Sequence, residues 1–340
     1  MATIASTSVV ALDAQKNIRE DLGNVIFNVT PFMTPFTSGI AQTRATADTH
    51  EWLTDTYEDA IDTNARVEAG LPQTSTAGTT RVRLGNFIQI ADKTVTVTKK
   101  AEFMDRAGIP GKEMAYQLMK LGKELQMDVE KQTLGCYGAV STKLQGTAAN
   151  AGVSGAFGSY LVTNQQNGGV AGAVANPGNA AGVGDGSTVP TVGGVTAAIE
   201  QARMDSLLDG VWDNSGDINS AKIMASAGTV SSLRNTLNGM ADNVDSNLNA
   251  NSTSGGNIIS RVAVYVSQFG PIAVVPNKHM PANTLYVVDY STWGLAFAGG
   301  KKIHTTDIAT QTSAEQKLLE CYYTLEARSE EANAAYYNIA

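Results

Sequence analysis

Histidine and cysteine, which often carry catalysis or bind metals, are few and widely separated in this chain. The histidines are His50, His279 and His304, and the cysteines are Cys136 and Cys321. A zinc protease needs two histidines four residues apart on one helix face, and no such spacing occurs. Neither cysteine has a partner at metal-binding or redox spacing, so both are expected to be reduced thiols in a protein that folds inside a cell. The sequence predicts no metal site and no cofactor.

Other short motifs add no chemistry. Gly182-Val-Gly-Asp-Gly186 has the glycines of a phosphate-binding loop, but it lacks the preceding strand and the Lys-Ser/Thr ending. No Gly-x-Ser-x-Gly nucleophile elbow occurs. A pair of catalytic carboxylates stays open as an alternative, because the geometry of Asp and Glu is not visible in a sequence. We predict no catalytic residue, and a soluble enzyme with an unrecognised site is the least favoured reading.

The composition indicates a folded protein with little charge. Hydrophobic residues make up 43% of the chain and charged residues 16%, and there are 33 glycines. Since globular domains usually carry about a quarter charged residues, this surface is expected to be buried against partners or built of neutral loops. The net charge of −8 excludes a basic nucleic-acid binder. Met1–Val10 has neither the basic start nor the apolar run of a signal peptide.

The longest helical pattern runs from Ile109 to Gly135. Its apolar residues recur at spacings of three and four and predict one buried helix face. They are Met114, Leu118, Leu121, Leu125 and Val129. The charged residues of this stretch are expected to face solvent, and they are Lys112, Lys120, Lys123, Glu124, Asp128, Glu130 and Lys131. On its own this is an amphipathic helix on a globular core.

Two extended parts precede that helix. Residues 1–45 read as an arm in which Pro31 and Pro35 favour extended backbone, and its apolar side chains need either their own core or a neighbouring subunit. Residues 46–100 predict a long two-stranded excursion with a small-residue tip. Its outgoing limb is acidic and its returning limb basic, so charges pair either within the loop or with a partner. Because an isolated two-stranded arm is marginal in water, docking on a partner is favoured.

The remaining chain divides into three parts. Residues 139–190 are rich in glycine, carry only Lys143 and Asp185 as charges, and predict a flexible surface loop. Residues 191–298 predict an α+β unit with a hairpin that turns at Gly270-Pro271. The C-terminal segment alternates as one long strand with a predicted buried face. That face carries Leu319, Cys321, Tyr323, Leu325 and Ala327.

This order of parts resembles the major capsid proteins of tailed bacteriophages, which share the HK-ninety-seven-type capsid fold. The resemblance runs from about residue 17 to the C-terminus and is weakest in the glycine-rich stretch. Short motifs in the same order strengthen it: Arg19-Glu-Asp-Leu22, Thr34-Pro-Phe36, His50-Glu-Trp52 with Asp55, Asn86 with Gln89-Ile90, Tyr116-Gln-Leu118 with Lys123-Glu-Leu125, and Tyr323-Thr-Leu-Glu326 with Glu330 and Ala332.

The resemblance implies an α+β capsid subunit with five parts. They are an N-terminal arm (1–45), an extended β-hairpin loop (46–100), a peripheral domain with a spine helix at 110–135 (101–190), an axial domain (191–298), and a C-terminal strand that returns to the peripheral domain (299–340). Such a subunit would form hexamers and pentamers of an icosahedral shell around viral DNA. The candidate subunit-interface residues are Phe32, Phe36, Trp52, Asp55, Glu58, Arg81 and Arg83.

The implied partners are copies of the chain itself, a portal, and a cement protein in some shells. Because the arm begins almost at Met1, scaffolding is expected to be a separate protein or an extension removed earlier. The acidic chain would enclose double-stranded DNA without specific binding, away from any membrane, after assembly in the host cytoplasm. The alternative function is another phage structural subunit, such as a tail-tube or cement protein.

Overall fold

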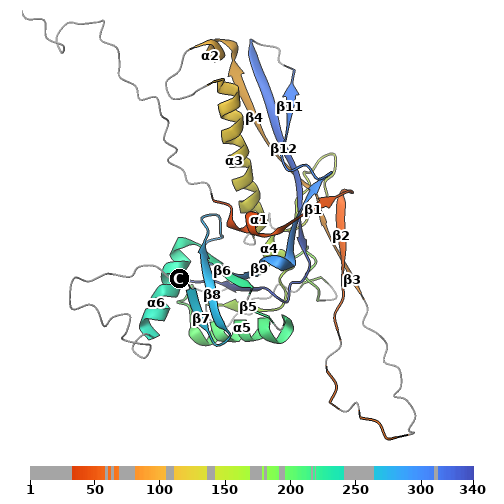
Figure 1. Cartoon of the computed structure of the whole chain (residues 1–340), viewed down its shortest axis with the longest axis vertical. Coiled ribbons are helices and arrows are strands. Elements are labelled where there is room, and N and C mark those ends of the chain that lie inside the picture. The colour runs from red at the N-terminus through yellow and green to blue at the C-terminus, as the bar shows by residue number, and fades with distance from the viewer. Residues whose placement is uncertain are drawn as a thin grey trace, which may run out of the picture.

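Two sheets and one long helix organise the computed structural model (Figure 1). The described residues are 33–57, 60–62, 65–68, 81–104, 111–135, 142–168, 178–179, 182–190, 196–215, 217–218, 220–240, 264–309 and 313–340. Phe32 and Glu58 lie outside these ranges, as does most of the predicted arm.

The five-stranded sheet is built around its longest strand, β12 (Ala314–Ala327). Two antiparallel neighbours share one edge of β12, and β4 pairs antiparallel along the other edge. A further strand, β1, joins β10 in parallel. The bounds are β1 Ala41–Ala45, β4 Gln89–Thr98, β10 Trp293–Ala298 and β11 His304–Ile308. The predicted alternation of β12 is confirmed, because all five residues of its predicted inner face are buried.

The long helix α3 (Glu113–Leu134) lies along β4 and β12. Met114, Leu125 and Val129 are buried, while Leu118 and Leu121 pack at the edge of the core, which confirms the predicted apolar stripe. At about 1.5 Å per residue the helix is a rod of roughly 33 Å. The short helix α2 (Lys99–Phe103) connects the end of β4 towards α3.

The six-stranded sheet has the order β5-β13-β9-β6-β8-β7. Two helices, α5 (Gln201–Ser215) and α6 (Ala227–Met240), contribute to the apolar cluster on one of its faces. The strands are β5 Gln165–Asn167, β6 Ala221–Ala225, β7 Val264–Ser267, β8 Gly270–Pro276, β9 Leu285–Asp289 and β13 Ala334–Tyr337. The predicted hairpin at Gly270 is confirmed as β7–β8, which pair antiparallel.

A separate two-stranded hairpin, β2 (Thr49–Thr54) with β3 (Val82–Phe87), projects from the body of the molecule (Figure 1). The predicted excursion over 46–100 therefore includes too much, because residues 89–98 form β4 of the five-stranded sheet. Two further predicted domain boundaries differ from the structure, again because a strand pairs in another sheet than the one predicted. Strand β10 lies in the five-stranded sheet rather than with the 191–298 unit, and β13 returns to the six-stranded sheet. Alternation of apolar and polar residues identifies a strand but does not show which strand it pairs with.

The predicted flexible loop over 139–190 is wrong for its described middle part. The helix α4 (Phe157–Tyr160) lies in the core, and Phe157, Tyr160 and Leu161 are fully buried. Trp293 packs on Phe157 with 4.4 Å between ring centroids, and Tyr286 packs on it at 4.6 Å. Glycine content misled the prediction, because glycine also permits close packing. Gly186 has φ +82°, and a Cβ there would lie 2.6 Å from the Tyr160 ring.

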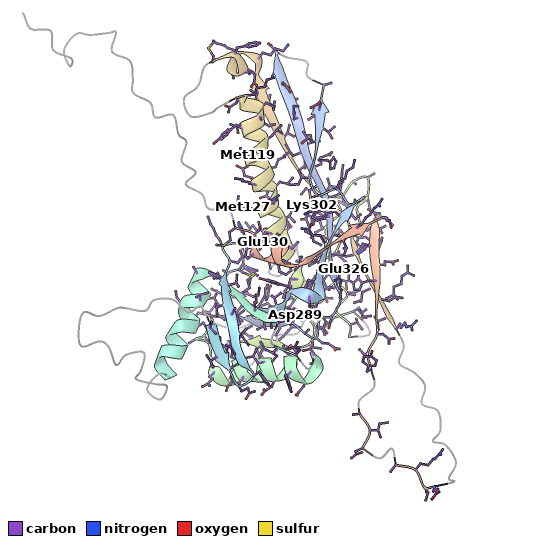
Figure 2. All side chains as sticks on the ribbon, in the orientation of Figure 1. Met119, Met127, Glu130, Asp289, Lys302 and Glu326 are labelled. Atoms are coloured by element: carbon purple, nitrogen blue, oxygen red, sulfur yellow. The ribbon has the colours of Figure 1, made fainter. Side chains whose placement is uncertain are left out.

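Glu130 on α3 is also placed differently from its prediction, since it is 0% exposed rather than facing solvent. Its carboxylate accepts hydrogen bonds from the Phe36 and Thr37 backbone N–H groups at 2.9 and 2.8 Å. These groups belong to the first turn of α1 (Pro35–Gly39). Asn277 donates a third hydrogen bond at 2.7 Å through Nδ2. Figure 2 labels Glu130 where α3 meets α1. The carboxylate thus joins the arm, α3 and the segment after β8.

Replacing Glu130 with Ala should lower the free energy of unfolding by about 3 kcal/mol, because three buried donors lose their acceptor. Glu124→Ala on the same helix is the matched control, since it removes only partly exposed ion pairs with Lys93 (3.5 Å) and Lys120 (4.0 Å) and should cost less than about 1 kcal/mol. Urea unfolding of both variants measures the difference. Equal losses in the two variants would contradict a joining role for Glu130.

Candidate subunit interface

The base of the β2–β3 hairpin is fixed by one buried amide, Asn86. Its side chain is 0% exposed, and Nδ2 donates to the Leu325 carbonyl at 2.8 Å and to the Ser154 Oγ at 3.0 Å. Its Oδ1 accepts from the Gly155 N–H at 2.8 Å. These bonds link β3 to two parts of the body, one to β12 and two to the segment before α4. A buried amide with all its groups paired holds one orientation, because any other leaves polar atoms unpaired.

Side chains next to Asn86 reinforce this base. The Lys143 ammonium donates to the Gly85 carbonyl at 3.1 Å and lies 3.4 Å from the Asp185 carboxylate. Trp52 of β2 packs its ring against Tyr160, with 6.0 Å between centroids. On β2 these contacts reach as far as Trp52, and the part of the hairpin beyond it extends away from the body (Figure 1).

A charged cluster lies where β2 meets β12. The Glu326 carboxylate is 3.5 Å from the His50 Nε2 and 3.2 Å from the Arg328 Nε, and it accepts from the Thr43 Oγ1 at 3.1 Å. The His50 imidazole, then Arg328 and Thr43, hold the pKa of Glu326 well below its usual value, at about 2. Figure 2 labels Glu326 in this region. The hairpin base therefore rests on a carboxylate that stays ionised through the neutral and mildly acidic range.

The outer face of the hairpin carries two cross-strand ion pairs. Arg81 donates through Nε to the Asp55 carboxylate at 3.2 Å, and Arg83 pairs with Glu51. Strand alternation puts Leu53, 65% exposed, on this same face. Of the two alternatives for the separated charges, the structure contains pairing within the loop. Because all four charged side chains are exposed, each pair contributes about 0–1 kcal/mol to the hairpin.

The structure brings four of the predicted interface residues together. Trp52, Asp55, Arg81 and Arg83 all lie on the hairpin, with Trp52 at its base. Phe36 is instead 0% exposed and packs edge-on against Phe157, with 5.8 Å between ring centroids. This side chain therefore packs in the core of its own subunit. Phe32 and Glu58 fall on residues outside the described ranges.

Sequence reasoning missed the exposed apolar side chains of the excursion. On the outgoing limb they are, besides Leu53, Tyr57, Ile61 and Val67, and on the returning limb Val82 and Ile90. Their signal was present as apolar residues among the charges of the outgoing limb, but pattern alone does not show that a residue is uncovered. In the described part of the chain, no three His, Cys, Asp or Glu side chains are grouped so that they could hold a metal ion. None of the described helices has both the length and the apolar character to cross a bilayer.

A projecting hairpin, a long helix along a five-stranded sheet and a separate α+β sheet define an HK-ninety-seven-type capsid fold, and solved structures share it. The chain is similar to one in the cyanophage A-1(L) capsid, with 13% identity, TM-score 0.64, and coverage of 95% of this chain and 97% of that one. A capsid chain of a native GTA particle matches with 14% identity, TM-score 0.59, and coverage of 99% and 100%. A chain of the holo-SrpI encapsulin complex from Synechococcus elongatus matches with 10% identity, TM-score 0.50, and coverage of 92% of each.

Since encapsulins share this fold, the family is decided by sequence. The model of the SU10 major capsid protein family matches residues 3–340, and the chain belongs to that family. It is a major capsid protein, a structural subunit of a bacteriophage virion whose copies associate into a shell. Comparison with curated proteins gives no match.

The low pKa of Glu326 predicts a pH-dependent contribution to stability. A carboxyl whose pKa is lower in the folded protein stabilises it above the unfolded pKa, about 4.5, and this contribution disappears as the pH falls through about 2. Glu326→Gln should cost at most about 3 kcal/mol near neutral pH, and less as the solution becomes more acidic. Unfolding of both proteins by urea between pH 6 and pH 2 measures this. A difference that stays constant over the range would contradict the assignment.

Proposed function

We propose that this capsid protein forms hexamers and pentamers, and that these build an icosahedral shell enclosing packaged double-stranded DNA. The observation that carries the proposal is the hairpin, which is anchored rigidly at its base and leaves apolar side chains exposed beyond the body. An exposed apolar segment on a rigid projection suits a contact with a second subunit. The predicted assignment of residues 46–100 as a loop that reaches a neighbour is narrowed to the β2–β3 hairpin and its tip.

The arrangement of the two sheets and α3 supports the other domain assignments. The five-stranded sheet with α3 as its spine would be the peripheral domain, and the six-stranded sheet with α5 and α6 the axial domain. The axial domains would surround the five-fold and quasi-six-fold centres. Helix α3, which packs along β4 and β12, would be the rigid rod of the peripheral domain.

Charge and chemistry support an enclosing role. The net charge of −8 disfavours tight binding to a polyanion, so the DNA would be contained without specific contacts. We propose no catalytic role for the chain. Its further partners would be a separate scaffolding protein, a portal and possibly a cement protein, and assembly would take place in the host cytoplasm before the shell becomes part of the virion.

Reversing Arg81 and Arg83 to Glu should reduce shell yield at least tenfold while the subunit remains folded, because the hairpin would then carry one sign of charge on its outer face. Negative-stain images of purified particles and circular dichroism of the subunit measure the two effects. Normal shells from this variant would contradict an inter-subunit role for that face.

A charge swap separates the two uses of these arginines. Compared with Arg83→Glu alone, Glu51→Arg combined with Arg83→Glu restores this cross-strand pair with its polarity reversed. Recovery of shells by the swap would mean that the charges serve only the hairpin. Continued failure, with the subunit folded, is the result expected if Arg83 also meets a neighbouring copy.

Expression of the chain without other phage proteins tests the separate scaffold. We expect aberrant or open assemblies, because nothing else in the mixture would set the curvature. Efficient formation of closed shells of uniform, correct size would contradict the need for a separate scaffolding protein.

A further inference from the structure

One face of the β7–β8 hairpin is apolar and uncovered. Val264 and Val266 of β7 are 47% and 76% exposed. Their cross-strand partners on β8 are Ala273 and Pro271, both exposed. The four uncharged side chains form a contiguous surface, which we call the β7–β8 face. Lys222 of β6, the cross-strand neighbour of Ala273, borders it, with its ammonium group over the Tyr290 ring at 4.7 Å.

The opposite face of this hairpin is apolar as well. The alternate residues Tyr265, Ile272 and Val274 are buried in the cluster that α5 and α6 share with the sheet. An antiparallel strand with one face in water normally alternates apolar and polar residues. Strands that are apolar on both sides are typical of sheets buried on both sides, which indicates that the β7–β8 face is covered in the working state of the protein.

The sheet order shows why this face stays bare in the single subunit. Met224, Tyr286 and Tyr337 on the inner strands point to the same side as the β7–β8 face, and they pack into the aromatic core with Phe157 and Trp293. That core ends before β8 and β7, which are the last two strands in the order. Among the described residues, β7 also has no strand paired to its outer edge.

We propose that the β7–β8 face binds a second copy of this chain in the shell, through an uncharged surface of that copy. The proposal rests on the proposed function, since a shell brings copies of one chain into contact on several sides. The connection between α6 and β7 is a weaker candidate for the cover, because its longer part, residues 242–257, is mostly Asn, Ser, Asp and Gly, and Ile258-Ile259 is its one pair of adjacent large apolar residues. Apolar side chains need an apolar cover to remove them from water.

The contact would extend around the tip of the hairpin. Phe269, in the turn between β7 and β8, stacks on Trp212 of α5 with 5.1 Å between ring centroids, and Trp212 is itself exposed. A partly exposed aromatic pair beside an apolar strand face is the composition that enriches the centre of protein interfaces.

Val266→Glu tests the proposal, because this side chain points away from its own subunit. We expect the urea midpoint of the unassembled subunit to stay unchanged and the yield of shells to fall at least tenfold, by negative stain and sedimentation. Thr305→Glu, at an exposed position of the edge strand β11, is the matched control and should assemble like the wild type. Wild-type shell yield from Val266→Glu would overturn the proposal, and so would a lowered midpoint, which would mean that a segment of the same subunit covers the face.

Alkylation of Val266→Cys identifies the cover directly. The introduced thiol should react with a maleimide in the unassembled subunit and be at least tenfold slower in the assemblies, open or closed, that this chain forms without other phage proteins, as mapped by mass spectrometry. Equal reactivity in both states overturns the proposal, as does protection that appears only when a second protein is added to the shells. If the wild-type chain forms no assemblies of any kind, open or closed, the proposed function fails instead, which this comparison reveals before any variant is made.

Discussion

The buried carboxylate of Glu130 is the interaction on which the arrangement of the parts depends. It accepts two backbone N–H groups of α1 and the side chain of Asn277, so α3, the arm and the six-stranded sheet meet at one ionisable group. Burial and the charge of Glu130 raise the pKa of Tyr290, beside it, to about 12. Without α1, the carboxylate would lose two of its donors in an apolar setting, which is costly. Docking of the arm and burial of Phe36 are therefore one event.

Asn86 fixes the orientation of the hairpin, as Glu130 fixes that of the arm. In both places the apolar core supplies most of the stabilisation, and a single polar group with several partners selects the orientation. Asn333 is a third case, because it accepts from the Asp289 N–H and the Trp293 indole, each at 2.9 Å, and donates to the Ser329 carbonyl at 2.8 Å. These groups lie where elements from distant parts of the sequence cross. A subunit that must present several surfaces at fixed angles needs such joints.

The parts that were predictable from sequence are those with a local period. The stripe of α3, the alternation of β12 and the β7–β8 turn all depend on residues within one element. Glu130 and Asn86 were not predictable, because their partners lie up to 147 and 239 residues away along the chain. The aromatic centre around Phe157 was hidden by its glycine-rich surroundings. The hairpin was recognised from its local pattern, but its end at Phe87 was not, because the pairing of the next strand, β4, with the distant β12 is not visible in the sequence.

The surfaces left exposed constrain the kind of assembly. The hairpin and the β7–β8 face are chemically different, because the hairpin has paired charges around Leu53 and the β7–β8 face is apolar with Lys222 at its border. In Figure 1, β7 and β8 lie at the left of the molecule and the β2–β3 hairpin lies at the right. A self-complementary dimer uses the same surface on both partners. Two unlike surfaces on opposite sides instead suit head-to-tail contacts, in which each copy offers one surface and receives another. Such contacts close into rings when the rotation between neighbours divides a full turn, and a small change in that rotation converts a ring of six into a ring of five. Fixed joints at Glu130 and Asn86 would limit the rotation to a narrow range, which is what a closed shell built from one chain requires.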